Sequence, residues 1–93
     1  MNKKLNKIRV KLDKLDNKIL NIISKRTKLI DNVIKIKLYK KDIVDKSRIK
    51  KILSNIKKKS QSKNIDVILT RKIWSSMIKA YIDYEFRNFI KKK

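Results

Sequence analysis

The side chains that could do chemistry in this chain are charged rather than nucleophilic. Its 93 residues include no cysteine and no histidine, which excludes a thiol nucleophile and a cysteine-ligated metal and removes the commonest general base. The sequence also lacks metal-ligand spacing, a glycine-rich phosphate loop and a Ser/His/Asp set. Four cations and one carboxyl group remain as candidates: Arg9, Arg26, Lys37, Arg48 and Glu85. Any chemistry that these residues perform must depend on binding a ligand and on charged groups held at fixed positions beside it.

Arg26 and Lys37 are two cations that helical spacing places on one face. Arg26 interrupts an otherwise aliphatic series, where a guanidinium is costly unless an anion meets it. Lys37 follows 11 residues later, close to three full helical turns, and so returns to nearly the same face. The pair predicts a pocket for an anionic ligand. The alternative is that Arg26 extends its head group to solvent or pairs with a nearby carboxylate.

Glu85 is the candidate acid. It lies four residues after Tyr81 and four before Phe89, on an apolar stripe of the last predicted helix. Burial there would favour the protonated form of the carboxyl group, which can donate a hydrogen bond. The alternative is a glutamate at the edge of the stripe that pairs with a lysine.

A long helix must position the first of these residues. A heptad pattern of aliphatic side chains predicts one helix over about residues 3–40. Apart from Arg26, its members are Leu5, Ile8, Leu12, Leu15, Ile19, Ile22, Leu29, Val33 and Ile36. Such a helix would be about 55 Å long, whereas a compact globule of this chain length has a radius of gyration of about 12 Å. The helix therefore predicts a partner, most simply a second copy of the chain.

A second, shorter helix is predicted over about residues 46–59. Asp45 or Ser47 can cap it by accepting its free backbone N–H groups. One face of this helix is apolar, formed by Ile49, Ile52, Leu53 and Ile56. The polar stretch 57–64 is then a loop or the frayed end of the helix.

A third helix is predicted over about residues 66–90, with Asp66 as its N-cap. The chain has no glycine and no proline, so tight turns lack their usual residues. This composition disfavours a β-rich fold. We therefore expect an all-α fold with a long, a short and a medium helix, in a single domain over residues 1–93.

The formal net charge of +21 predicts attraction to nucleic acid or anionic membranes whatever the function. The alternative is the coding bias of an A/T-rich genome, since nearly all the excess is lysine. Because such a bias explains the lysines, an arginine is a stronger indication of a functional position than a lysine is. The five arginines are Arg9, Arg26, Arg48, Arg71 and Arg87. No apolar run approaches the ~20 residues of a membrane span, and no signal-peptide pattern is present. We expect a cytoplasmic protein.

Taken together and in order, several segments resemble the all-α chorismate mutase family over about residues 5–89. The segments are Ile8-Arg9, Leu15 to Leu20, Arg26, Ile34 to Lys37, Val44 to Arg48 and Asn64 to Asp66. The resemblance implies an intertwined homodimer of three-helix subunits with antiparallel long helices and shared active sites. It also implies the Claisen rearrangement of chorismate to prephenate, on the route to phenylalanine and tyrosine, without metal or cofactor.

The resemblance implies a role for each candidate residue. Arg26 and the partner subunit's Arg9 would bind the two carboxylates of the substrate. Arg48 would support the carboxylate end of the pocket, and Asp45 would help to hold the ring hydroxyl group.

The remaining roles concern the ether oxygen, which becomes electron-rich as its bond breaks. Lys37 would donate a hydrogen bond to it, and Glu85 occupies the position of a second donor, which it can be only when protonated.

Two positions depart from the family pattern. Ile49 stands directly after Arg48, where the family usually carries a glutamate that binds the substrate's hydroxyl group. Tyr81 stands where a small hydroxyl residue often contacts a carboxylate, and its phenol could still donate. The connection from Lys37 to Arg48 is also about one residue short, which could shift Asp45.

These departures leave alternatives open. One is an inactive, regulatory or partner-dependent homologue on the same fold. Another is an isochorismate-pyruvate lyase on this scaffold. A third is a basic nucleic-acid-binding helical protein, although the lysines are scattered over all helices and aromatic residues for base stacking are few. We expect no specific nucleic-acid partner and no membrane partner.

Overall fold

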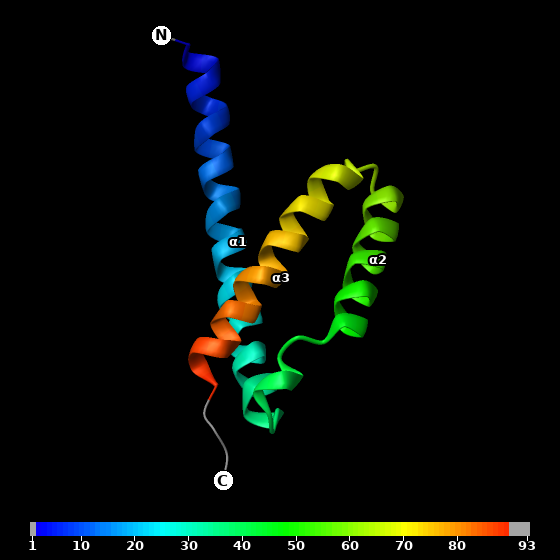
Figure 1. Cartoon of the computed structure of the whole chain (residues 1–93). Coiled ribbons are helices and arrows are strands. Elements are labelled where there is room, and N and C mark those ends of the chain that lie inside the picture. The colour runs from blue at the N-terminus through cyan, green and yellow to red at the C-terminus, as the bar shows by residue number, and fades with distance from the viewer. Residues whose placement is uncertain (1, 90–93) are drawn as a thin grey trace. The chain divides into compact units, whose positions relative to one another are not determined.

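The computed structural model describes residues 2–89, and all of its regular structure is helical (Figure 1). The elements are α1 (Lys3–Ile36), a short 3-10 helix η1 (Lys40–Asp42), α2 (Lys46–Ser62) and α3 (Val67–Asn88). No strand occurs within residues 2–89, so the prediction of an all-α fold with three helices is confirmed. The predicted end of the third helix, residue 90, lies outside the described residues.

The described chain divides into two compact units, residues 2–33 and residues 34–89. The prediction of a single domain therefore stays a prediction. Among the described residues, no helix combines the length and apolar character that crossing a membrane requires.

The first unit is the greater part of α1. The side chain of Asn2 starts the helix, because its Oδ1 accepts hydrogen bonds from the backbone N–H groups of Lys4 and Leu5 at 3.0 and 3.3 Å. The apolar heptad side chains of this unit expose between 38% and 65% of their surface. They are Leu5, Ile8, Leu12, Leu15, Ile19, Ile22, Leu29 and Val33, and we call them the α1 seam.

The long helix ends four residues earlier than the sequence pattern predicts. Leu38 and Tyr39 are compatible with a continued helix, but α1 stops at Ile36. Directly after it, the Lys37 ammonium makes hydrogen bonds to Ile43 and Glu85. Tertiary contacts of this kind can override helix propensity, which is a weak preference.

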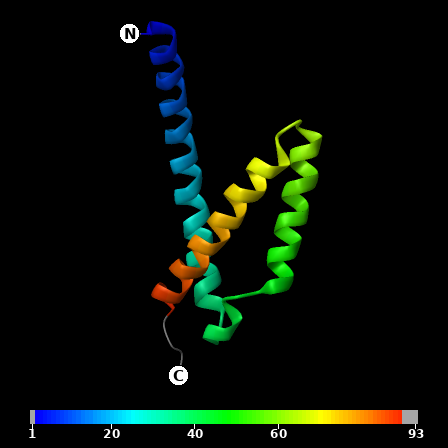
Figure 2. The same cartoon turned by 45° about the horizontal axis from the view of Figure 1, so that its top comes forward.

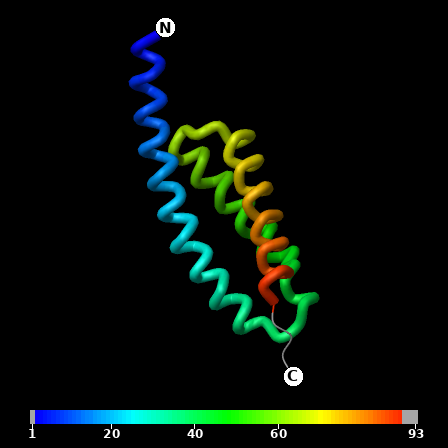
Figure 3. The backbone as a smooth tube through the Cα atoms, turned by 90° about the vertical axis from the view of Figure 1, so that its left-hand side faces the viewer, coloured from blue at the N-terminus to red at the C-terminus, as the bar shows by residue number. Residues whose placement is uncertain are grey.

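In the second unit, α2 and α3 pack against each other as an antiparallel pair (Figures 2 and 3). Ile78 of α3 is buried. Near the hairpin end, Ser60 Oγ donates to the Ile56 carbonyl at 2.6 Å. Its only proton is thereby used, so Thr70 Oγ1 donates to Ser60 Oγ at 2.8 Å. This buried hydroxyl pair links the two helices.

The same serine explains why α2 is longer than predicted. The sequence leaves the polar stretch 57–64 as a loop or as the frayed end of the helix, and α2 continues three residues past the predicted end, to Ser62. The Ser60 hydroxyl bonds back within the helix and across to α3, so a residue that usually favours turns is satisfied inside a helix.

Helices α2 and α3 each begin at an aspartate that caps the first turn. Asp45 Oδ1 accepts from the Arg48 backbone N–H at 3.0 Å. Asp66 Oδ1 accepts from the Ile68 and Leu69 N–H groups at 2.8 and 3.4 Å. These bonds satisfy donors that the first turn of a helix leaves free. The predicted caps are confirmed, with Asp45 rather than Ser47 at α2.

Asn64 makes the turn between α2 and α3 in a chain without glycine. Its φ is 57°, in the left-handed region. The Ile65 N–H donates to the Ser60 carbonyl at 2.8 Å, and the Asn64 N–H donates to the Gln61 carbonyl at 3.2 Å. Together these bonds form a Schellman motif, in which asparagine is the usual substitute for glycine.

Asn64→Ala should lower the free energy of unfolding by about 1 kcal/mol, because a side chain with a Cβ is disfavoured in the left-handed conformation. Asn64→Gly should preserve or raise it. Denaturant unfolding at one fixed protein concentration measures both. Asn55→Ala is the matched control within α2, where alanine is the better helix former. An Asn64→Ala protein at least as stable as Asn64→Gly would contradict this role.

Candidate functional site

The candidate site of the second unit is built around an ion pair between Lys37 and Glu85. Lys37 Nζ donates to Glu85 Oε1 at 3.0 Å. The lysine directly follows α1, and the glutamate lies near the end of α3, 48 residues later. The pair therefore ties the connection between α1 and α2 to the third helix.

Burial distinguishes this ion pair from the exposed Arg87–Asp83 pair on α3. The Lys37 and Glu85 side chains are 20% and 8% exposed. The Arg87–Asp83 pair on α3 is 64% and 68% exposed, so solvent weakens it strongly. A carboxylate as buried as Glu85 needs a cation or hydrogen-bond donors. Glu85 thus combines features of the two alternatives given by the sequence, since it is buried on α3 and is also paired with a lysine.

The backbone carbonyl of Ile43 is the second acceptor for the Lys37 ammonium, at 3.4 Å. Ile43 is only 3% exposed and follows η1, whose last turn closes with the Ile43 N–H donating to the Lys40 carbonyl at 3.0 Å. The buried side chain and this turn hold the carbonyl in place. Within residues 2–89, the Lys37 ammonium makes these two hydrogen bonds and no third.

Sequence reasoning missed Ile43 because a backbone carbonyl leaves no signature in residue type. The only available signal is its apolar side chain within a connection that is otherwise largely polar, from Lys40 to Lys46. Such a residue indicates an anchored loop rather than a solvated one.

Asp45 and Arg48 lie at the start of α2, shortly after Ile43. The Asp45 carboxylate is the helix cap, and both side chains are exposed. The Arg48 guanidinium has no hydrogen-bond partner among the described residues. The expected contact of Asp45 with a substrate hydroxyl group stays a prediction, and one of its oxygens already accepts the Arg48 N–H.

Tyr81 lies one helical turn before Glu85 on α3 and is half-buried. Its ring meets that of Tyr84 edge to face, with centroids 6.2 Å apart and planes at 79°, a geometry that aromatic pairs prefer. Its expected contact with a carboxylate stays a prediction.

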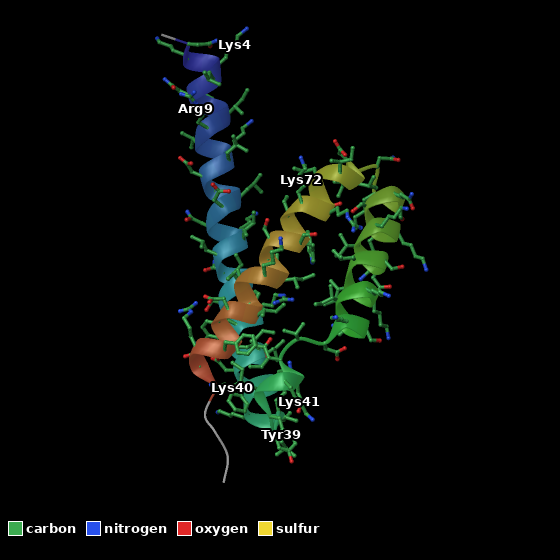
Figure 4. All side chains as sticks on the ribbon, in the orientation of Figure 1. Lys4, Arg9, Tyr39, Lys40, Lys41 and Lys72 are labelled. Carbon is green, nitrogen blue, oxygen red and sulfur yellow. The ribbon has the colours of Figure 1, made fainter. Side chains whose placement is uncertain are left out.

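Arg9 and Arg26 belong to the first unit, on α1. Arg9 is exposed (Figure 4) and Arg26 is partly buried. The structure brings together Lys37 and Glu85 among the predicted site residues. A common site with the two arginines of α1 stays a prediction.

Comparison with protein families gives one finding of direct relevance to this site. The family described as chorismate mutase type II matches residues 8–86. This range includes every site residue predicted from the sequence, from Arg9 to Glu85. The comparisons with curated proteins and with solved structures gave no match.

Lys37→Met should lower the free energy of unfolding by about 3 kcal/mol, because it leaves the Glu85 carboxylate buried without its cation. The double variant Lys37→Met/Glu85→Leu should recover most of that loss, since it removes the stranded charge as well. Urea unfolding at matched protein concentration measures both.

Asp83→Asn on the exposed Arg87 pair is the control for this experiment. It should change the free energy of unfolding by less than about 1 kcal/mol. Equal effects of Asp83→Asn and Lys37→Met, or a double variant no more stable than the single one, would show that burial of the Lys37–Glu85 pair is not what matters.

Proposed function

The chain belongs to the chorismate mutase type II family, and we propose that it is an isomerase that rearranges chorismate to prephenate in phenylalanine and tyrosine biosynthesis. In this reaction an ether C–O bond breaks while a C–C bond forms within the same molecule. No nucleophile, base, metal or cofactor is required. A chain without histidine and cysteine is therefore chemically adequate for it.

In such a reaction the protein must hold the substrate in a reactive conformation and stabilise the transition state. It must select a compact substrate conformer in which the two carbon atoms that will bond lie close together. It must also place positive charge or hydrogen-bond donors where the ether oxygen gains negative charge in the transition state.

The observation that carries this proposal is the unused donor of Lys37. An ammonium group has three N–H donors, and Glu85 Oε1 and the Ile43 carbonyl accept two of them. These contacts fix the head group of an otherwise flexible side chain. The third donor is free to bind the ether oxygen, and its charge would stabilise the transition state without reorganisation.

Glu85 is proposed as the second donor to the ether oxygen. Its Oε1 accepts from Lys37, and Oε2 has no hydrogen-bond partner among residues 2–89. A proton on Oε2 would give the carboxyl group one O–H donor.

The proposed carboxylate-binding groups are Arg26, Arg48 and the partner subunit's Arg9. Guanidinium groups suit this role because they bind carboxylates through two parallel hydrogen bonds. Arg9 and Arg48 are exposed, and their guanidinium groups make no hydrogen bond within the described chain, so neither group must break a bond to receive a ligand. Tyr81 would donate to a carboxylate and Asp45 would accept from the ring hydroxyl.

A homodimer with shared active sites completes the proposal. The α1 seam presents eight apolar side chains on one helix, each at least 38% exposed. Contiguous exposed apolar surface of this kind usually marks an interface. A second copy of α1, antiparallel to the first, would cover the seam and bring the partner subunit's Arg9 to the site.

Lys37→Ala and Arg26→Ala should each reduce the turnover of chorismate by about 100-fold or more, since loss of one placed donor typically costs that much. A chorismate-consumption assay with identification of the product measures this. Lys35→Ala, an exposed lysine two residues before Lys37, is the matched control and should retain turnover. Circular dichroism and sedimentation must show that each variant keeps its helicity and mass.

Near-normal turnover in either site variant would overturn the assignment of these residues. An unaltered protein that is folded and dimeric but forms no prephenate would overturn the proposed activity itself. It would then favour the inactive or partner-dependent homologue, which Ile49 also supports.

Leu15→Lys should dissociate the proposed dimer, because it places a charge within the α1 seam. Sedimentation equilibrium at micromolar concentration should give twice the chain mass for the unaltered protein and a lower mass for the variant. Lys14→Ala, at the adjacent exposed position, should leave the dimer intact. An unaltered protein that sediments as a folded monomer would contradict the shared site.

A further inference from the structure

The hairpin of α2 and α3 contains a groove that shares no residue with the proposed catalytic site. Its cavity volume is about 180 Å³. Four aliphatic side chains line it, two from each helix: Leu53, Ile56, Val67 and Ile68. Thr70 also lines the groove, but its hydroxyl proton is donated to Ser60. The surface is therefore mainly apolar.

Two cations line the same groove, Lys57 from α2 and Arg71 from α3. Both are exposed, and neither side chain makes a hydrogen bond or ion pair within residues 2–89. The structure thus combines an apolar surface with two uncompensated positive charges.

Arg71 is the more informative of these two cations. The chain has 29 lysine and arginine residues, of which five are arginine. Three of the five have a place in the proposed catalytic site, and Arg87 pairs with Asp83. Arg71 has neither role. Its planar guanidinium is suited to bind a carboxylate through two hydrogen bonds.

We propose that this groove binds a small monocarboxylate with one compact apolar body, such as a single aromatic ring. An apolar cavity of ~150 Å³ admits a benzene ring, so the groove is large enough for one ring. The ring would contact the aliphatic side chains while the carboxylate meets Arg71 and Lys57. The inference is independent of the proposed catalytic function.

A second copy of the chain is a less suitable occupant. The surface proposed to associate with a second copy is the apolar α1 seam. Such a surface would leave Arg71 and Lys57 of the groove without a counter-charge. A small anion supplies the missing charge.

The experiment is a titration of the full chain with 3-phenylpropionate, followed by the ¹³C-methyl NMR signals of Leu53, Ile56, Val67 and Ile68. These signals should shift and saturate at millimolar concentration. The neutral 3-phenylpropanamide should bind roughly tenfold more weakly, because it lacks the charged acceptor. Propionate, which lacks the ring, should give no saturable shift.

Arg71→Gln should weaken binding of 3-phenylpropionate roughly tenfold, whereas Lys72→Gln should change it less than twofold. Lys72 is the adjacent exposed cation on α3 (Figure 4), and the two variants change the net charge equally. Lys57→Gln provides a second variant, on the other helix, if Arg71→Gln does not fold. Neither groove variant should alter chorismate turnover.

Three results would overturn the proposal. Equal affinity for the acid and the amide would remove the role of the cations. Shifts confined to the Ile43 methyl, beside the Lys37–Glu85 pair, would place the ligand in the catalytic site. Methyl signals at the groove that respond to protein concentration and not to 3-phenylpropionate would show that a second copy covers it.

Discussion

The structure of the second unit depends on a buried carboxylate that must have a cation beside it. Glu85 is 6% exposed, and an ionised carboxylate at such a position is stable only with compensation. Lys37 supplies it at 3.0 Å, but only because α1 ends at Ile36 and the chain turns through η1. The need of Glu85 for a cation therefore links three features of the fold: the end of α1 at Ile36, the turn of the chain through η1, and the position of α3.

A buried ion pair is not the simplest way to build the core of a helical unit. A buried ion pair is seldom more stabilising than apolar residues of equal size. The apolar stripe of α3 could continue through position 85 with a leucine and a simpler core. A lysine fixed by two acceptors with one donor unused is the observation on which the proposed catalytic role rests.

The sequence predicts most of the fold because its signals are local. The heptad pattern predicts the long helix, and Asp45 and Asp66 cap the next two helices as expected from their residue type. Two boundaries are not predictable in this way. Helix α1 ends directly before Lys37, whose tertiary hydrogen bonds outweigh the helix propensity of the residues that follow. Helix α2 continues because Ser60 bonds to Thr70 across the hairpin. The Lys37–Glu85 contact joins residues 48 positions apart, which helical periodicity alone cannot place at hydrogen-bond distance.

The net charge of the chain and the single cations that its fold holds in position have different consequences for ligand binding. A charge of +21 attracts any anion and can accelerate its encounter with the surface, but salt screens it and it selects no particular ligand. Selection requires cations held at fixed positions with donors unused, as at Lys37, or beside an apolar surface, as at Arg71. The many solvated lysines therefore explain attraction in general, whereas specificity must come from the few cations that the fold positions.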